Sequence, residues 1–266
     1  MKVSLDITAV KENERLKKTD EVAVEHLLKI YVNKKRFLSV TCSPENLEYL
    51  VFGLLFSDGL IKDKSEVRSL NVKNGYCYAE VKEDSPLFHH QRIRSSGCGN
   101  AFFTPPKMEK VNAPFFTVSP ETISHLIKDL ERISQTYHST GGVHSAALAD
   151  QERIVLFSED IGRHNAVDKV IGEALVKGIN TADKIFLTSG RISSEIVSKV
   201  ARANGSVIVS KSAPTSWAVK LARFYRMTLI GFARGKRFNL YTHPERVLFL
   251  SPSPGGRGEE RGNDER

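Results

Sequence analysis

The chain has 266 residues, of which 40% are hydrophobic and 26% are charged. That length and composition allow one large domain or two small ones with a substantial core, and they exclude a chain that is disordered throughout. Lysine and arginine number 39 against 31 acidic residues, for a net charge of +8, so we expect anionic partners such as nucleotides, pyrophosphate, nucleic acid or acidic proteins.

Residues 1–113 predict a small α+β domain. Apolar runs at 22–32 and 36–40 flank a short polar turn and indicate two paired strands, and a third strand is expected at 76–81. Residues 84–113 lose all periodicity, which predicts a long loop, and long loops within compact proteins are often functional.

One helix is predicted between these strands. Ser43 is a favourable N-cap, and Pro44 directly after it suits the first helical position. Apolar residues follow at helical spacing over 47–55, and Gly59 is placed to end the helix.

From residue 114 onward helices and short apolar strands alternate. This pattern predicts a second domain, 114–250, in which helices cover a sheet. The polar tail 251–266 is expected to be disordered. The expected elements are helices at 119–133, 164–177, 193–203 and 214–224, and strands at 145–148, 153–157, 184–188, 206–210 and 227–232.

Cys98 is the strongest candidate for a chemical role. Glycines flank it on both sides, so nothing bulky shields the sulfur, and Arg92 and Arg94 lie just upstream. Nearby cations lower the pKa of a thiol and make a thiolate available. The alternative is a small buried side chain, which is the better interpretation for Cys42 and Cys77 because both lie in strand-like runs.

Three turns predict contacts to an anionic ligand. His164 and Asn165 stand at a predicted helix start, where free backbone N–H groups attract anions. The turns 188–191 and 210–214 place hydroxyl residues between a strand and a helix, where ligands of α/β sheets gather. The alternative for the first turn is a capped, solvated helix start, and neither of the other two matches a known phosphate-loop pattern.

A basic turn follows the last apolar strand. Arg234, Lys236 and Arg237 surround Gly235 beside Phe232, so they could hold a phosphate while the ring stacks on a base. An ordinary basic hairpin turn explains the same spacing.

Several classes of protein are excluded by missing patterns. The sequence has no Cys-x-x-Cys, no His-Glu-x-x-His, no Gly-x-Ser-x-Gly, and no zinc-deaminase motif. No signal peptide or membrane-spanning run is recognisable, so we expect a cytoplasmic protein without membrane contact.

Six segments together resemble the formate dehydrogenase accessory sulfurtransferases, the FdhD-type family, and the similarity covers roughly residues 20–250. The helix at 42–61 also looks like the family's. The six segments are SSGCG (95–99), TGGVHSAAL (140–148), EDIGRHNAVDKVIG (159–172), SGRISSEIVSKVA (189–201), KSAPTSWAVKLA (211–222) and GFARGKRFNLYTHPERV (231–247).

The resemblance implies a sulfur carrier. Such a protein takes sulfur from an IscS-type cysteine desulfurase as a persulfide, here on Cys98, and passes it to the molybdenum or tungsten bis(molybdopterin guanine dinucleotide) cofactor of formate dehydrogenase. It also implies a C-terminal three-layer domain like that of cytidine deaminases but without zinc, and a homodimer. The cofactor would contact Phe232, Ala233, Arg234, Gly235, Lys236 and Arg237.

One position departs from the family pattern. Many members carry a second cysteine three residues after the first, whereas this chain has Ala101. A chaperone that binds the cofactor without moving sulfur therefore stays open as an alternative. A hydrolase using Cys98 and His144 lacks a recognisable orienting partner, and no fold signature supports a nucleic-acid-binding protein.

Overall fold

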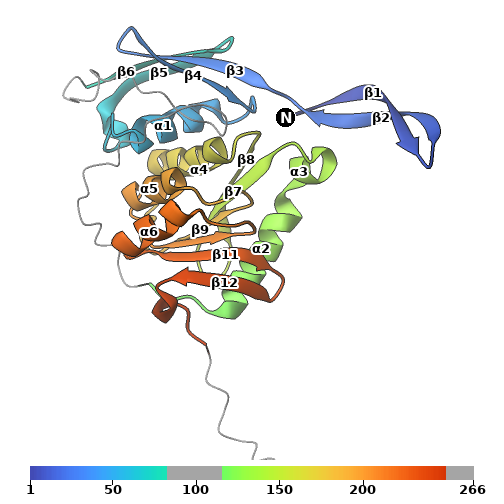
Figure 1. Cartoon of the computed structure of the whole chain (residues 1–266). Coiled ribbons are helices and arrows are strands. Elements are labelled where there is room, and N and C mark those ends of the chain that lie inside the picture. Colours follow the sequence, from blue (N-terminus) through green and yellow to red (C-terminus); the bar gives the residue numbers. More distant parts are fainter. Residues whose placement is uncertain (83–115, 250–266) are drawn as a thin grey trace, which may run out of the picture.

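The computed structural model describes residues 1–82 and 116–249, which fold around three separate β-sheets (Figure 1). Single 3-10 turns lie at Lys64–Glu66 and Pro244–Arg246. The strands are β1 Lys2–Lys11, β2 Glu14–Ala23, β3 His26–Val32, β4 Lys35–Cys42, β5 Val67–Lys73, β6 Tyr76–Val81, β7 His144–Ala149, β8 Ile154–Asp160, β9 Ile185–Thr188, β10 Val207–Ser210, β11 Thr228–Arg234 and β12 Arg237–Thr242. The helices are α1 Leu47–Ser57, α2 Pro120–Ile133, α3 Gln135–Thr140, α4 Arg163–Lys177, α5 Ser194–Arg202 and α6 Ser216–Phe224.

The first sheet is a two-stranded hairpin, β1 and β2, that projects from the rest of the molecule (Figure 1). This hairpin was not predicted, although Val3, Leu5 and Ile7 alternate with polar residues along β1 as they do in a strand. Most of its side chains are exposed, including those of Val10 and Leu16. The strand predicted at 22–32 begins too early. Residues 22–23 belong to the end of β2, and β3 begins at His26.

The second sheet has four strands in the order β4-β3-β6-β5. Alternate residues of its strands are buried against α1, for example Leu28 and Ile30 on β3 and Cys77 on β6, which pack with Leu50 and Leu54 of the helix. The predicted strands at 36–40 and 76–81 and the helix over 47–55 are confirmed. Strand β5, which the sequence analysis missed, completes the sheet's outer edge.

The start of α1 differs from the prediction. Its N-cap is Asn46, which has a φ of 55° and makes no side-chain capping bond. Ser43 instead binds across to β8. Its backbone N–H donates to Asp160 Oδ2 at 3.0 Å, and its hydroxyl accepts from the N–H of Ile161 at 3.1 Å. The predicted end is confirmed, since Gly59, with a φ of +74°, follows directly after the last turn.

Helices α1 and α4 cross in backbone contact and join the second sheet to the third (Figure 1). A Cβ atom added to Gly53 on α1 would lie 1.9 Å from the carbonyl oxygen of Asp168, and one added to Gly172 on α4 would lie 1.9 Å from that of Tyr49. Any side chain at either position would push the helices apart, so both glycines are needed for this close approach.

The third sheet has six strands in the order β12-β11-β10-β9-β7-β8, of which β9, β10 and β11 are parallel neighbours. Helices cover both faces. Phe186 and Ile208 pack on the side of α4, α5 and α6, whereas Leu187 and Val209 pack on the side of α2. All four predicted long helices and all five predicted strands are present. The predicted α/β class is therefore confirmed.

Two expectations about the organisation stay predictions. The boundary expected between residues 113 and 114 lies outside the described residues, as does the tail 251–266. The expected likeness of the C-terminal domain to cytidine deaminases also stays a prediction, although the helix–sheet–helix layering agrees with a three-layer domain.

Candidate functional site

One edge of the six-stranded sheet collects the ends of four strands. Strand β7 runs antiparallel to both β8 and β9, so β8 points in the same direction as β9, β10 and β11. Their carboxyl ends therefore meet at one edge, which we call the carboxyl edge. Helices α4, α5 and α6 each begin just after one of these strands. Three helix N-termini, with their positive dipole ends, consequently lie along it. Ser193 caps that of α5 and Thr215 caps that of α6.

The loops at this edge are held by their own hydroxyl groups. Ser189 Oγ accepts a hydrogen bond from the N–H of Ser145 at 2.9 Å. Ser210 Oγ donates to the carbonyl of Gly190 at 2.7 Å and accepts from the N–H of Ser212 at 2.9 Å. The structure thus brings the predicted turns 188–191 and 210–214 together. Because both hydroxyl groups already form hydrogen bonds within the protein, backbone N–H groups and neighbouring cations would have to bind an anion here.

His144 lies at the same edge, at the start of β7. Its Nδ1 is 3.4 Å from Ser189 Oγ. Burial lowers the pKa of His144 below its ordinary value, and the positive charges of Arg163 and Arg191 lower it further. The imidazole is therefore neutral at physiological pH. Ser189 is an orienting neighbour for His144 that sequence analysis alone did not identify.

The regular pairing of β11 with β12 is interrupted at Phe232. Its φ is 54°, in the left-handed region that bulky residues rarely adopt, and the pairing with β12 shifts register between Gly231 and Arg234. The Phe232 side chain is 38% exposed, and its N–H donates to the carbonyl of Ser212 at 3.1 Å. Such backbone strain persists where the surroundings enforce it, and it clusters at functional sites.

The basic turn 234–237 is a β-hairpin that extends beyond the carboxyl edge. Arg234 and Arg237 face each other as the closing pair, and Gly235 has a φ of +56° with open space around its α-carbon. The three cationic side chains are exposed. Ala233 differs from the other predicted contact residues, because its methyl group is buried in the core on the α2 side. Only its backbone could reach a ligand.

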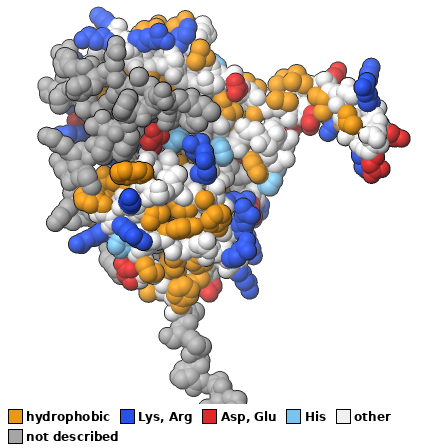
Figure 2. Space-filling model, viewed as in Figure 1, with side chains coloured by type: hydrophobic (Ala, Val, Ile, Leu, Met, Phe, Trp, Pro, Cys, Tyr) orange, Lys and Arg blue, Asp and Glu red, His pale blue; other side chains and the backbone are white. Residues whose placement is uncertain are grey.

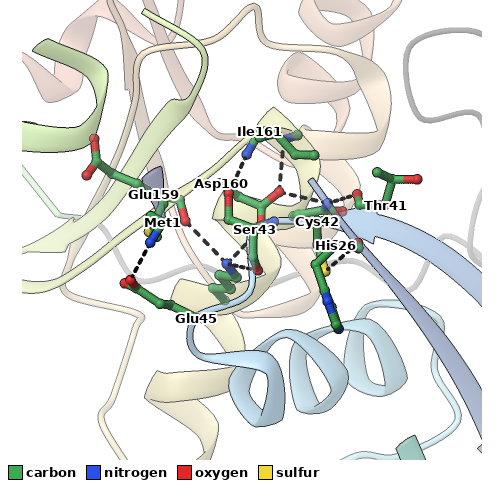
Figure 3. A network of polar contacts seen from close by, with 12 residues as sticks. Met1, His26, Thr41, Cys42, Ser43, Glu45, Glu159, Asp160 and Ile161 are labelled. Atoms are coloured by element: carbon green, nitrogen blue, oxygen red, sulfur yellow. Dashed lines mark hydrogen bonds and ion pairs between the residues drawn. The ribbon is translucent and has the colours of Figure 1, made fainter. Parts of the chain in front are cut away.

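Side chains of the segment 159–172 form a buried polar network (Figure 3). Lys169 Nζ lies 2.7 Å from Asp160 Oδ2, and both side chains are fully buried. The same ammonium donates to the carbonyls of Ser43 and Glu159, each at 3.3 Å. Asp160 Oδ1 accepts from the N–H of Gly162 and from Asn165 Nδ2, both at 2.9 Å. We call this network the seam, because it joins Ser43, in the N-terminal part of the chain, to Asp160 of β8 and Lys169 of α4.

One of the two interpretations of His164 and Asn165 is corrected by their contacts. Asn165 Nδ2 also donates to the carbonyl of Thr41 at 2.9 Å. His164 Nε2 lies 3.0 Å from Ser193 Oγ and 3.1 Å from Glu195 Oε2. Both side chains are buried and bind other parts of the protein, so the interpretation as a solvated helix start is wrong. Anion binding by the backbone N–H groups of this helix start stays a prediction.

The thiol groups of two of the three cysteines are unreactive. Cys42 and Cys77 are fully buried, and burial raises the pKa of each thiol to about 12. They stay protonated at neutral pH, which confirms that they are packing residues. Cys98 and Ala101 lie outside the described residues, as do Arg92 and Arg94.

Residues 1–82 and 116–249 show neither a metal-ligand cluster nor a helix suited to a membrane. In these ranges no group of three His, Cys, Asp or Glu side chains is placed to hold a metal ion. None of the helices described there combines the length and the apolarity that crossing a bilayer requires.

Comparison with known proteins places this arrangement in a family. The family model described as the FdhD/NarQ family matches residues 23–248. The chain is 38% identical to the "Sulfur carrier protein FdhD" of Bacillus subtilis (strain 168), covering 91% of this chain and 96% of that protein. It is 39% identical to the protein of the same name from Staphylococcus aureus (strain MRSA252), over 86% of this chain and 90% of that one.

A solved structure agrees with these relatives. The structure described as a putative formate dehydrogenase accessory protein from Desulfotalea psychrophila superposes with a TM-score of 0.78 at 26% identity, covering 93% of this chain and 99% of that chain. The family match spans both the four-stranded and the six-stranded sheet, and it includes the seam and the carboxyl edge. The chain belongs to the FdhD/NarQ family.

Proposed function

We propose that this protein is a sulfur carrier that serves formate dehydrogenase. The observation that carries the proposal is the match, over 91% of the chain, to a relative named as a sulfur carrier protein. The curated Bacillus and Staphylococcus relatives share that name, and the structural neighbour is described as a formate dehydrogenase accessory protein.

In this proposal Cys98 carries the sulfur. Its thiolate attacks the outer sulfur of a persulfide on a cysteine desulfurase, so that a new S–S bond forms on Cys98 and the donor cysteine leaves as a thiolate. Delivery of this sulfur as sulfide consumes two electrons, which a thiol reductant supplies, and returns Cys98 to a thiol. The buried thiols of Cys42 and Cys77, with pKa values raised to about 12, are unsuited to the same attack.

The acceptor is the molybdenum or tungsten bis(molybdopterin guanine dinucleotide) cofactor, which we place as substrate at the carboxyl edge. Its pyrophosphates suit the helix N-termini there and the exposed cations Arg234, Lys236 and Arg237. Phe232, held at a left-handed φ at this edge, is suited to stack on a guanine. Ala233 and Gly235 contribute backbone only. The proposal includes a cytoplasmic homodimer, without nucleic acid or membrane as a partner.

Sulfur loading tests the first half of the proposal. The protein is incubated with a cysteine desulfurase and cysteine carrying radioactive sulfur, and the intact mass is recorded. We expect one added sulfur, which a reductant releases and which the Cys98→Ala variant does not acquire. Cys77→Ala is the matched control and should load normally. A wild-type protein that gains no sulfur, yet binds the cofactor and supports dehydrogenase maturation, would establish the alternative of a chaperone.

Ligand binding tests the second half. Calorimetry with GDP and ADP at matched salt should show a preference for the guanine nucleotide. Arg237→Ala should weaken GDP binding about 10- to 100-fold, since charge-assisted contacts contribute about 1.5–3 kcal/mol each. Arg153→Ala is the matched control, because this exposed arginine precedes β8 and so lies at the opposite edge of the same sheet. Unchanged affinity in the Arg237 variant would show that the turn is an ordinary solvated hairpin.

A further inference from the structure

The four-stranded sheet has an outer face that is separate from the carboxyl edge. Its inner face is buried on α1, so alternate side chains point away from the helix, and many of these are exposed. Figure 1 places this sheet at the far end of the molecule from β11 and β12. In Figure 2 apolar and basic side chains share the surface over this end.

Three tyrosines form a cluster on that outer face. Tyr76 and Tyr78 lie two residues apart on β6, and Tyr31 lies beside them on β3. The Tyr31 ring centroid is 5.2 Å from that of Tyr78 and 6.5 Å from that of Tyr76, and Tyr76 and Tyr78 are 6.4 Å apart. All three pairs are stacked, with interplanar angles from 8° to 25°. Tyr78 is nevertheless 55% exposed and Tyr76 is 37% exposed.

Basic side chains surround this cluster. Lys29 pairs with Tyr76 in the β3–β6 ladder, and its Nζ lies 5.2 Å from the Tyr76 ring centroid. Lys73 pairs with Tyr76 from β5, and Arg36 pairs with Tyr31 from β4. Glu80 is the acidic side chain at the far end of β6 on the same face. We call the set of Tyr31, Tyr76, Tyr78, Lys29, Arg36 and Lys73 the tyrosine face.

The geometry of the rings decides which ligand fits. The rings of Tyr31 and Tyr78 stack on each other at 5.2 Å, and the ammonium group of Lys29 lies over the ring of Tyr76. Ring edges and hydroxyl groups of the exposed Tyr76 and Tyr78 side chains are then the parts most suited to a ligand. Aromatic edges are electropositive and phenolic hydroxyls donate hydrogen bonds, so they add to the attraction that the three cations exert on carboxylates.

We propose that the tyrosine face docks an acidic surface of a partner protein. Charge complementarity supports this occupant, and tyrosine and arginine are the residues that most often dominate the binding energy of protein interfaces. Nucleobase stacking fits less well, because a base needs a free ring face, whereas Tyr31 and Tyr78 stack on each other and Lys29 lies over Tyr76. The inference is independent of the proposed sulfur transfer, since it uses neither Cys98 nor the carboxyl edge.

The test uses the full-length protein and fluorescent poly-L-glutamate as the acidic probe, with oligothymidylate of equal charge in a parallel series. We expect poly-glutamate to bind, and Lys29→Glu combined with Lys73→Glu to weaken it about tenfold. Lys17→Glu combined with Lys128→Glu is the matched control, because it changes the net charge equally at exposed lysines on β2 and α2. Tyr78→Ser should weaken binding without changing the net charge.

A second measurement needs no variant. Carbodiimide joins lysine amines directly to carboxylates in contact with them, so cross-links between the wild-type protein and poly-glutamate should concentrate on Lys29 and Lys73. Cross-links spread evenly over the lysines, equal losses in both charge-reversal pairs, or absence of binding would overturn the proposal. Tighter binding of oligothymidylate through the same lysines would also overturn it and would indicate a nucleic acid as the partner of this face.

Discussion

The seam and the exposed part of the carboxyl edge at Phe232 both lie at carboxyl ends of strands in the six-stranded sheet, yet they are built on opposite principles. At the seam, Asp160 and Lys169 are fully buried and each charge has several partners. At the carboxyl edge, Phe232 is held at a left-handed φ and the cations of the neighbouring hairpin are exposed. The seam therefore stabilises the fold, whereas the edge keeps strain and unused charge available for a ligand.

This difference changes how the polar segment 159–172 should be interpreted. Its density of charged residues is typical of a ligand site, but in the structure these side chains bind β4, α1 and α5. A concentration of polar residues in a sequence can thus mark a buried junction. The predictions below test this division, beginning with the change expected to cost most.

Removing Lys169 should cause the largest loss of stability. In Lys169→Met, Asp160 stays buried without its ion partner, and breaking such a pair typically costs about 3–5 kcal/mol. The free energy of unfolding, measured in urea, reports the effect. Asp160→Asn combined with Lys169→Met is the control and should recover part of the loss, because no buried charge remains, although the asparagine NH2 group cannot accept the bonds that both oxygens of Asp160 accept. A single variant within about 1 kcal/mol of the wild type would show that the pair is not held as described.

Disturbing the contact between α1 and α4 should cause the next largest loss of stability. Gly172→Ala should reduce the free energy of unfolding by about 1–3 kcal/mol, since the added methyl group meets the backbone of Tyr49, although alanine favours helix. Gly178→Ala is the matched control. It has open space around its α-carbon, so only the strain of its φ of +66° opposes the substitution. A Gly172 variant that unfolds no more easily than the Gly178 variant would contradict backbone contact between α1 and α4.

Regular elements with a clear apolar pattern could be predicted from the sequence. The helix α2 shows apolar residues at helical spacing, and β9 and β10 are short continuous apolar runs, as expected for parallel strands that are buried on both faces. The projecting hairpin β1–β2 was overlooked, although Val3, Leu5, Ile7 and Ala9 alternate with polar residues along β1, which is the pattern of a strand. The start of α1 was misplaced because Ser43 has every local property of an N-cap but bonds to residues more than a hundred positions away.

The candidate site was predicted in part. Phe232 and the basic turn were identified, and the strand-end loops were found to meet, because parallel strands end at one edge. The contact of His144 with Ser189 depends on the pairing of β7 with β9, which no local pattern reveals. Gly53 and Gly172 gave a usable signal that was overlooked, since a glycine within a helical pattern often marks a close approach.

His144 should make stability depend on pH at the carboxyl edge. Its pKa is lowered in the folded protein by burial and by Arg163 and Arg191, so the unfolded chain binds the proton more tightly. The stabilisation is fully present above the ordinary value of 6.5 and decreases as the pH falls through that value toward the folded-state pKa. Thermal unfolding midpoints between about pH 8 and about pH 5.5 should fall less in His144→Asn than in the wild type. An identical fall in both would exclude His144 as a cause.

Phe232 provides the smallest expected change in stability and the sharpest contrast with the seam. Replacing a well-buried phenylalanine usually costs about 3–5 kcal/mol, as we expect for Phe186→Ala in the core, where Phe186 is only 4% exposed. In Phe232→Asn the lost packing of a partly exposed ring is offset by relief of the left-handed φ, which asparagine tolerates. The free energy of unfolding should therefore stay within about 1 kcal/mol of the wild type. GDP affinity measured on the same sample should fall nonetheless, because the ring that stacks on the base is gone. A variant that loses stability but keeps its GDP affinity would reverse the assignment and make Phe232 a core residue.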